Sequence, residues 1–250
     1  MLNTTSKLFN KIIGEGLQFL LIFNNFIHPC QSGRLKHRST TNVDVALTYL
    51  IRSGWVKNLT MSMLAFNITQ FFPSLNHQLL SLILDKASFD YKILSFFKNY
   101  LVSRKTKYLW NNFSSPFCNV DIGISQESAL FPILSALYLF LIFCILEKHQ
   151  KNLKIPILIV SFVDGLFISQ YRSIPVSNEN LYYSYNVIST LLTKFRLIMK
   201  YRKTEVFHFS RLCGVSNPLP LDLTLFGGFI LLPKTMWWYI SFFFDQKLLF

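Results

Sequence analysis

The chain has 250 residues, of which 51% are hydrophobic and 16% aromatic, and its formal net charge is +13. This length suits one large domain or two small ones, and no linker, repeat or low-complexity run divides the chain, so we expect one continuous domain. The four cysteines form no C-x-x-C pair and have no close histidine partner. This spacing argues against a zinc site and a disulfide framework and favours a reducing compartment.

The N-terminal residues 1–25 are expected to form an extension that precedes the main domain. Lys7 and Lys11 come before a short apolar run at 17–22, which two asparagines follow, and this pattern makes a poor signal peptide. Further along, residues 61–66 predict a strand, and Ser74 is a plausible N-cap for a helix. The apolar residues of that helix recur at helical spacing: Leu79, Leu80, Ile83, Leu84 and Ala87.

The middle of the chain predicts a second amphipathic helix over residues 93–101, then two short strands at 107–112 and 117–121. Residues 128–146 are uncharged and long enough to cross a membrane. The same stretch also suits a long helix buried beneath a sheet. Hydropathy alone leaves both interpretations open.

The C-terminal half predicts a hairpin formed by residues 157–163 and 166–169, then a helix over 181–198 that packs on the sheet. We therefore expect an α+β domain with helices packed on one face of an antiparallel sheet.

The segment 161–169, SFVDGLFIS, is the most informative motif of the chain, because it carries one carboxylate, Asp164, at the tip of an apolar hairpin. Asp-Gly between apolar runs is also an ordinary type I′ turn signal. The segment resembles the active-site hairpin of reverse transcriptases, which normally carries two acids at this point. Gly165 follows Asp164 directly, so the second acid has no counterpart here.

Two upstream segments resemble further motifs of that family. The segment 64–75, LAFNITQFFPSL, is similar to the first catalytic motif, with Asn67 in the position of an aspartate. The segment 123–134, GISQESALFPIL, is similar to the family's G-x-x-Q-G-S-x-L-S-P-x-L loop and helix, with Glu127 in place of a glycine and Phe131 in place of a serine.

Other segments resemble the remaining parts of the same enzymes in the expected order. Residues 26–33 and 38–41 look like the fingers motifs, YRKTEVF at 201–207 resembles the lysine motif of LINE-type enzymes, and WYISF at 238–242 stands where the primer-gripping hairpin belongs. Together the motifs resemble the reverse transcriptase domain of a LINE-type (non-LTR) retrotransposon. This resemblance implies a right-hand fingers-palm fragment over residues 26–250 that ends before a thumb.

The resemblance assigns roles to single residues. Asp164 would be the catalytic residue and the ligand of Mg²⁺, and the nucleotide would be bound by Phe72 as the steric gate, Gln126 in the pocket and Lys203 near the leaving phosphates. Without the resemblance these last three would be a core aromatic, a loop-capping amide and a surface lysine. The basic residues expected at the RNA template and DNA primer are Arg38, Arg104, Lys105 and Lys107.

The replacements predict that catalysis is impaired or absent. Nucleotide addition needs two Mg²⁺ ions held by carboxylates. An amide at position 67 leaves their charge uncompensated, and Glu127 would repel phosphate. Loss of a residue after Asp164 would also shift the register of the hairpin.

The sequence therefore favours an inactive RNA-directed DNA polymerase domain, located inside the cell in the nucleus or cytoplasm. Its basic clusters, at 34–38, 104–107 and 194–203, are spread along the chain, as in a nucleic-acid cleft. A remnant that binds nucleic acid without catalysis is the alternative. A membrane-inserted protein built around residues 128–146 is a third, although we expect no stable membrane association.

Overall fold

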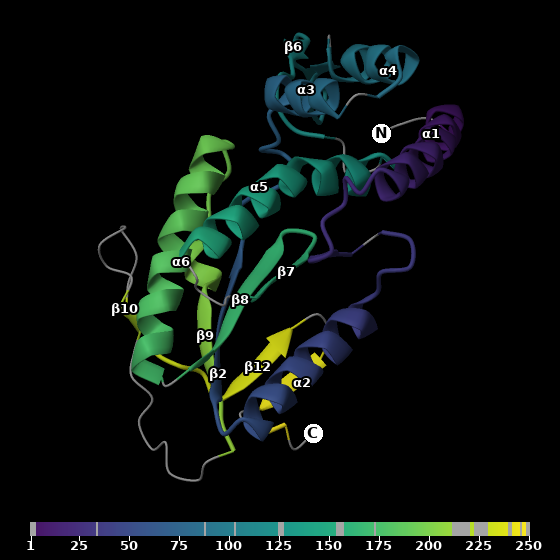
Figure 1. The fold of residues 1–250 in the computed structure, drawn as a ribbon. Helices are drawn as coiled ribbons and strands as arrows, with labels where there is room; N and C mark the ends of the chain where they lie inside the picture. Colours follow the sequence, from purple (N-terminus) through teal and green to yellow (C-terminus); the bar gives the residue numbers. More distant parts are fainter. Residues whose placement is uncertain are drawn as a thin grey trace. The chain divides into compact units, whose positions relative to one another are not determined.

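A computed structural model gives the fold shown in Figure 1. It describes residues 4–33, 35–87, 89–102, 104–124, 128–153, 158–172, 174–211, 221–222, 230–239, 242–245 and 247–248. The chain forms two compact units. Unit 1 consists of Met1–Ile27, Gln70–Phe140 and Phe195–Leu197, and unit 2 of His28–Thr69, Leu141–Lys194 and Ile198–Phe250.

Unit 2 contains a five-stranded sheet of order β1-β7-β8-β2-β9 (Figure 1). Its strands are β1 (Gln31–Ser32), β2 (Thr60–Asn67), β7 (Leu158–Phe162), β8 (Gly165–Arg172) and β9 (Glu205–Phe209). The helices of this unit are α2 (Thr40–Val56), α6 (Ile174–Lys194), the 3-10 helix η1 (Tyr201–Lys203) and the C-terminal part of α5 (Phe131–Leu153). Two small hairpins follow, β10 (Leu221–Asp222) with β11 (Ile230–Leu231) and β12 (Met236–Tyr239) with β13 (Phe242–Asp245).

Strand β2 lies at the centre of the packing in unit 2. It pairs with β8 on one edge and with β9 on the other, and all six residues between its ends are buried. Because side chains alternate along a strand, Met61, Met63 and Ala65 share one face, and they belong to the core that α2 completes. On the other face, the ring of Phe66 packs edge-on against Tyr185 of α6.

The predicted α+β fold and the hairpin at Asp164 are confirmed, with two refinements. Helices α2 and α6 cover opposite faces of the sheet, because β2 is apolar on both of them. The sheet is also mixed, since β1 runs parallel to β7 whereas the other strand pairs are antiparallel. The predicted strand at 61–66 is confirmed as β2. In the segment 238–242, Trp238 and Tyr239 belong to β12 and Phe242 to β13, and the other two residues lie outside the described part of the chain.

Unit 1 contains most of the remaining helices and four very short strands. They are α1 (Thr4–Phe23), α3 (His77–Lys86), α4 (Tyr91–Leu101), β3 (Lys105–Thr106), β4 (Leu109–Trp110), β5 (Phe113–Ser114) and β6 (Cys118–Asn119), with the N-terminal part of α5. Helix α1, which the sequence analysis assigned to an extension, packs inside this unit. Its Asn10 donates a hydrogen bond to Ser128, and its Phe9 contacts Phe96 of α4.

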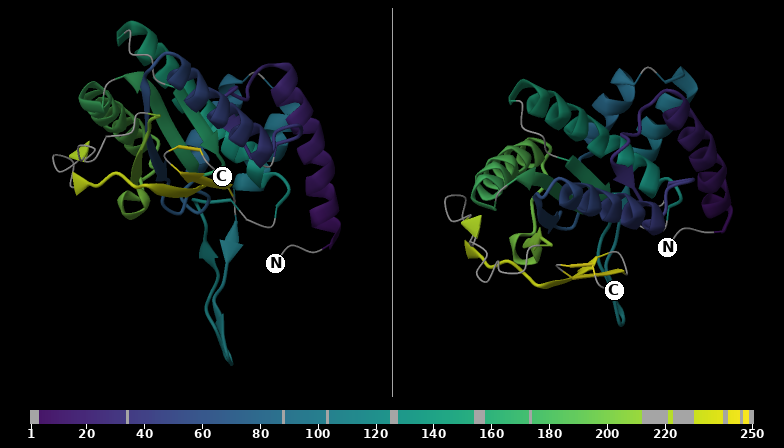
Figure 2. Two further views of the ribbon diagram at one scale, coloured as in Figure 1. Left: turned by 90° about the horizontal axis from the view of Figure 1, so that it is seen from below. Right: turned by 60° about the horizontal axis from the view of Figure 1, so that its bottom comes forward.

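Helix α3 begins two residues later than the sequence indicated. The expected N-cap Ser74 lies in a turn, and Asn76 caps the helix instead, because its side-chain oxygen accepts a hydrogen bond from the amide of Leu79 at 2.9 Å. The two strands predicted at 107–112 and 117–121 are shorter than expected. Strands β3 to β6 pair as a narrow projection, residues 104–120, which we call the arm (Figure 2).

The long uncharged stretch at 128–146 lies mostly in helix α5, which begins at Phe131 and ends at Leu153. By length and composition, residues 131–151 could cross a membrane, and 61% of the most apolar window is buried inside the protein. This burial is what the core-helix interpretation predicts. The helix predicted at 181–198 is α6, which lies at Ile174–Lys194.

A polar pair is buried within unit 2, where Ser62 on β2 is opposite His208 on β9. The hydroxyl oxygen of Ser62 lies 2.8 Å from Nδ1 of the His208 ring, and the Nε2 atom has no hydrogen-bond partner. Burial lowers the pKa of His208 from its usual 6.5 to about 4. The imidazole is therefore neutral in the folded protein at neutral pH.

We predict that this histidine makes the chain sensitive to acid. The unfolded chain binds a proton near pH 6.5 and the folded chain only near pH 4, so stability is complete above pH 6.5 and falls as the pH decreases. The loss from His208 between pH 7 and pH 4 should be about 3 kcal/mol. Urea unfolding at a series of pH values measures it.

The matched comparison is the double substitution Ser62→Ala with His208→Leu, because it removes both partners and leaves no buried polar group. This variant should lose about 3 kcal/mol less stability over the same pH range than the chain with Ser62→Ala alone. Equal pH dependence in the two variants would show that His208 is not the responsible group.

Candidate functional site

The candidate site lies in unit 2, where the end of β2 meets the turn between β7 and β8. Asn67 is the last residue of β2 and pairs with Gly165, the first residue of β8. The next residue, Ile68, donates its amide to the carbonyl oxygen of Asp164 at 3.0 Å. The structure thus brings together the two positions, 67 and 164, that the sequence analysis assigned to the catalytic pair.

The β7–β8 hairpin is closed by a two-residue turn made of Val163 and Asp164. Phe162 pairs with Gly165 in regular register, so no residue is missing after Asp164 and the expected shift in register does not occur. The turn is centred one residue earlier than the Asp-Gly pattern indicated. Gly165 has no positive φ, so the backbone at this position accepts side chains other than hydrogen.

Residues 32–33, at the end of β1, hold the β7–β8 turn in a strained backbone conformation. Val163 has a φ of 58°, which is unfavourable for a β-branched residue. Its amide donates to the carbonyl oxygen of Ser32 at 3.1 Å. Gly33 has a φ of 94°, and a Cβ atom there would come within 2.6 Å of Cγ2 of Val163. Only glycine lets the two segments approach this closely.

Lysines approach the same end of β2 from the segment before β9. The amide of Lys200 donates to the carbonyl oxygen of Asn67 at 2.7 Å, and Lys203 follows on η1, with its amide bonded to Lys200. Both side chains are exposed. Lys203 therefore belongs to the same region of unit 2 as Asn67 and Asp164.

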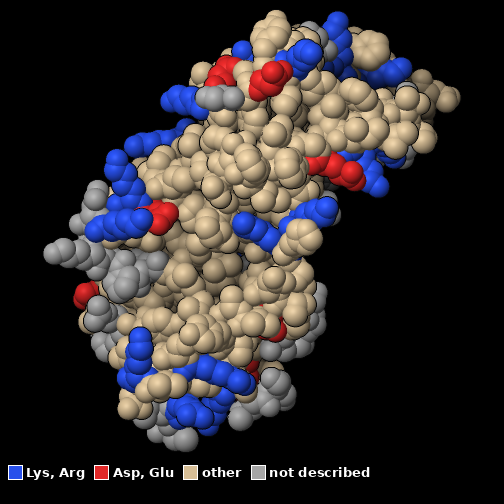
Figure 3. Space-filling view, turned by 45° about the vertical axis from the view of Figure 1, so that its right-hand side comes forward, with Lys and Arg blue, Asp and Glu red and all other residues tan. Residues whose placement is uncertain are grey.

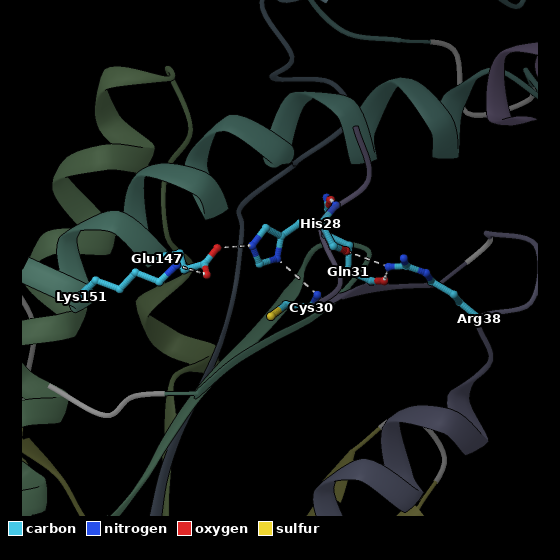
Figure 4. Close-up of polar contacts among 6 residues, drawn as sticks. All are labelled: His28, Cys30, Gln31, Arg38, Glu147 and Lys151. Carbon is cyan, nitrogen blue, oxygen red and sulfur yellow. Dashed lines mark hydrogen bonds and ion pairs between the residues drawn. The ribbon is translucent and has the colours of Figure 1, made fainter. Parts of the chain in front are cut away.

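Arg38 fastens the segment 28–32 that supports the turn (Figure 4). Its guanidinium donates to the carbonyl oxygens of His28, at 2.7 Å, and of Gln31, and lies 3.4 Å from that of Pro29. Burial lowers the pKa of Arg38 below its usual 12.5, and the charge is retained. The side chain that the sequence analysis assigned to nucleic acid thus holds backbone carbonyls in this structure.

A second set of polar contacts connects the segment 28–32 to α5 (Figure 4). The Nε2 atom of His28 lies 3.3 Å from Glu147, which also pairs with Lys151 at 2.8 Å. The hydrogen bond from Lys151, followed by the one from His28, lowers the pKa of Glu147. Burial, reinforced by the charge of Glu147, raises the pKa of Cys30 to about 11, so this thiol is protonated and unreactive at neutral pH.

In unit 1, the structure places the expected steric gate, Phe72, against another aromatic ring. Its ring centroid lies 3.7 Å from that of Phe131 and 5.0 Å from that of Phe71. Phe131 is the residue that replaces a serine in the resemblance, and it is buried. Gln126 and Glu127 lie outside the described residues.

The other basic residues singled out from the sequence, Arg104, Lys105 and Lys107, lie together at the base of the arm. Arg104 donates to the carbonyl oxygen of Gly123 at 2.9 Å, and the two lysines are exposed. Figure 3 shows lysine and arginine side chains in several separate groups on the face it draws, with few acidic ones. The positive charge is therefore distributed rather than concentrated in one patch.

The donor groups at the end of β2 do not fit a centre of two Mg²⁺ ions. Magnesium prefers several hard oxygen ligands, carboxylates above all. Here Asp164 supplies one carboxylate, Asn67 only a neutral amide, and Gly165 no side chain. In the described part of the chain, no group of three or more His, Cys, Asp and Glu side chains could hold a metal ion.

No model of a known protein family matches the sequence, and neither does any curated protein. Solved structures of similar fold do exist. Apo telomerase from Candida tropicalis, truncated from its C-terminal domain, superposes with a TM-score of 0.61 at 15% identity, over 82% of this chain and 40% of the telomerase chain. Telomerase from Candida albicans, in complex with a TWJ fragment of telomeric RNA, gives 0.61 at 12% identity, over 86% and 36%.

The chain has a reverse-transcriptase-like fold. This agrees with the family resemblance of its motifs, although the solved structures do not distinguish a LINE-type element from other reverse transcriptases. The chain spans less than half the length of these telomerases. Positions 67, 164 and 203, which the sequence singled out, lie in one region of unit 2. The sequence analysis missed Gly33, the residue that lets the turn close.

We predict that Gly33→Ala destabilises the chain by more than about 1 kcal/mol, because alanine is strained at this φ and its Cβ would overlap Val163. Gly16→Ala is the matched control. Gly16 lies within α1 and a Cβ atom there would meet nothing within 4 Å, so this substitution should stabilise by roughly 0.5–1 kcal/mol. Denaturant unfolding compares the two, and a neutral effect of Gly33→Ala would contradict the packing described.

Proposed function

We propose that the chain is the fingers-palm part of an RNA-directed DNA polymerase from a LINE-type (non-LTR) retrotransposon, and that its catalysis is impaired or lost. The five-stranded sheet of unit 2 would form the palm. The observation that carries the proposal is the meeting of Asn67, the Asp164 turn and the Lys203 segment at one end of the sheet. The order and spacing of the motifs favour a LINE-type element, in agreement with the reverse-transcriptase-like fold.

The impairment follows from charge. A second carboxylate beside Asp164 would compensate the charge of the metal ions that activate the primer hydroxyl, and the amide of Asn67 cannot do so. Replacing a carboxylate ligand in this way should slow nucleotide addition by roughly three or more powers of ten. Mg²⁺ binding at this site would accordingly be weakened. Incorporation of deoxynucleoside triphosphates, which depends on the metal ions, would be reduced as well.

The expected result in a primer-extension assay is no product above a blank, with Mg²⁺ or Mn²⁺, on an RNA template with a DNA primer. Asn67→Asp alone should not restore extension, because Gly165 and Glu127 remain. Extension by the unaltered chain that Asp164→Ala abolishes would show that the site is active and would overturn the proposed impairment.

Nucleic-acid binding without catalysis is the second function that an observation favours. The net charge of the chain is +13, and both units contain lysines and arginines. Phosphate contacts depend on charge rather than on the carboxylates at the site. The telomerases of similar fold from Candida albicans and Candida tropicalis were solved with a fragment of telomeric RNA, which supports RNA as the partner. We expect the chain to act inside the cell, without stable membrane association.

The chain should bind single-stranded RNA with little sequence preference, and log K should fall linearly with log salt concentration. Lys203→Gln should lower the slope by about one, because it removes one phosphate contact. Lys151→Gln is the control, since Lys151 is paired with Glu147, and it should leave the slope unchanged. Fluorescence anisotropy at several salt concentrations measures both, and binding without salt dependence would contradict the proposal.

A further inference from the structure

The arm of unit 1 exposes large aromatic side chains that the family motifs leave unassigned. Tyr108 is 69% exposed, Trp110 76% and Phe113 63%. Among the described residues, none of these three rings contacts another ring or a cation. Contiguous exposed apolar side chains of this size mark interaction surfaces rather than ordinary loops.

Strand geometry places the three rings on one face. Trp110 pairs directly with Phe113 across the turn at the tip of the arm, and residues directly opposite in an antiparallel pair point to the same side. Tyr108 lies two residues before Trp110, just outside β4, and its carbonyl oxygen accepts a hydrogen bond from the amide of Ser115 at 2.9 Å. This bond continues the pairing of β4 with β5, so Tyr108 shares that side. The amide of Tyr108 is fixed by Oγ of Ser115 at 2.8 Å.

The charge of the arm indicates which class of ligand its aromatic face would bind. The arm, residues 104–120, contains Arg104, Lys105 and Lys107 and no acidic residue, and Asp121 follows at its base. The three rings therefore stand on a segment of net positive charge. Single-stranded nucleic acids are bound by this combination, since bases stack on aromatic rings and basic side chains follow the phosphates. A membrane-inserting tip fits less well, because the outermost residues are the polar Asn111 and Asn112.

We propose that the arm is a base-stacking platform for single-stranded nucleic acid, with Tyr108, Trp110 and Phe113 against the bases and Lys105 and Lys107 against the backbone. The inference rests on the proposed nucleic-acid-binding function and names the surface that carries it. The arm needs no metal ion, and its residues are separate from Asn67 and Asp164 in the sequence. Binding through it is therefore independent of catalysis.

The test measures the anisotropy of a fluorescein-labelled single-stranded oligouridylate with the full chain. The double substitution Trp110→Ala with Phe113→Ala should weaken binding by roughly tenfold or more, with the salt slope unchanged. Lys105→Gln with Lys107→Gln should instead reduce the slope by about two. Tyr91→Ala is the matched control, because Tyr91 is 81% exposed on α4, and it should change the affinity less than twofold.

Two further readouts separate stacking from a general effect on folding. An abasic oligonucleotide of the same length should bind the unaltered chain and the Trp110→Ala, Phe113→Ala variant equally well. Trp110→Phe should keep the affinity for oligouridylate but lose the quenching of tryptophan fluorescence on binding, since phenylalanine still stacks.

The outcomes distinguish this inference from the function on which it rests. If the unaltered chain binds oligouridylate and the aromatic variant binds it equally well, the arm proposal is overturned and nucleic-acid binding stands. If the unaltered chain does not bind oligouridylate at all, both the arm proposal and the proposed nucleic-acid-binding function are overturned. A variant that loses self-association, or adsorption to anionic phosphatidylserine vesicles, while its oligonucleotide affinity is unchanged would assign the arm to those contacts instead.

Discussion

The double-sided burial of β2 is the constraint on which the rest of unit 2 depends. The strand pairs with β8 over its full length and with β9 over five residues, and its two faces pack against different helices, α2 and α6. A slip of one residue would exchange those faces, moving Met63 and Ala65 away from α2 and the Ser62–His208 pair out of alignment. The register is therefore fixed, and with it the place where Asn67 meets the Asp164 turn.

This constraint explains how the fold forms without acidic side chains at positions 67 and 165. The contacts that hold positions 67, 164 and 165 use backbone atoms: the amide of Ile68 bonds to Asp164, that of Lys200 bonds to Asn67, and Gly165 pairs with both β7 and β2. None of them requires a carboxylate. Removing acidic side chains here even relieves repulsion between like charges. Chemistry and folding are thus separable at this site, and loss of one does not entail loss of the other.

The sequence predicted those features whose cause is local. Short apolar runs identified β2 and the β7–β8 hairpin, helical spacing identified α4, and the motif order indicated which ends would meet. The sequence did not predict those features that depend on contacts between segments far apart in the chain. The parallel pairing of β1, the position of α2 on the second face and the three carbonyl oxygens around Arg38 depend on which segments become neighbours. The N-cap of α3 was predicted only two residues away from its actual position. Serine and asparagine are both good N-caps, and the turn at Gln70–Ser74 decides between Ser74 and Asn76.

Metal-assisted catalysis and nucleic-acid binding depend on distance in different ways. Metal-assisted catalysis requires particular oxygen atoms to be placed within a few tenths of an ångström of their ideal positions, so the proposed impairment needs no more than an amide in place of a carboxylate at position 67. Attraction to phosphates acts over about 10 Å at moderate salt and adds up over many side chains, so it tolerates single changes. Stacking requires only an exposed ring. Under the proposed function, the exposed basic side chains and the aromatic arm would therefore engage a polynucleotide without the precise geometry that catalysis needs at Asp164.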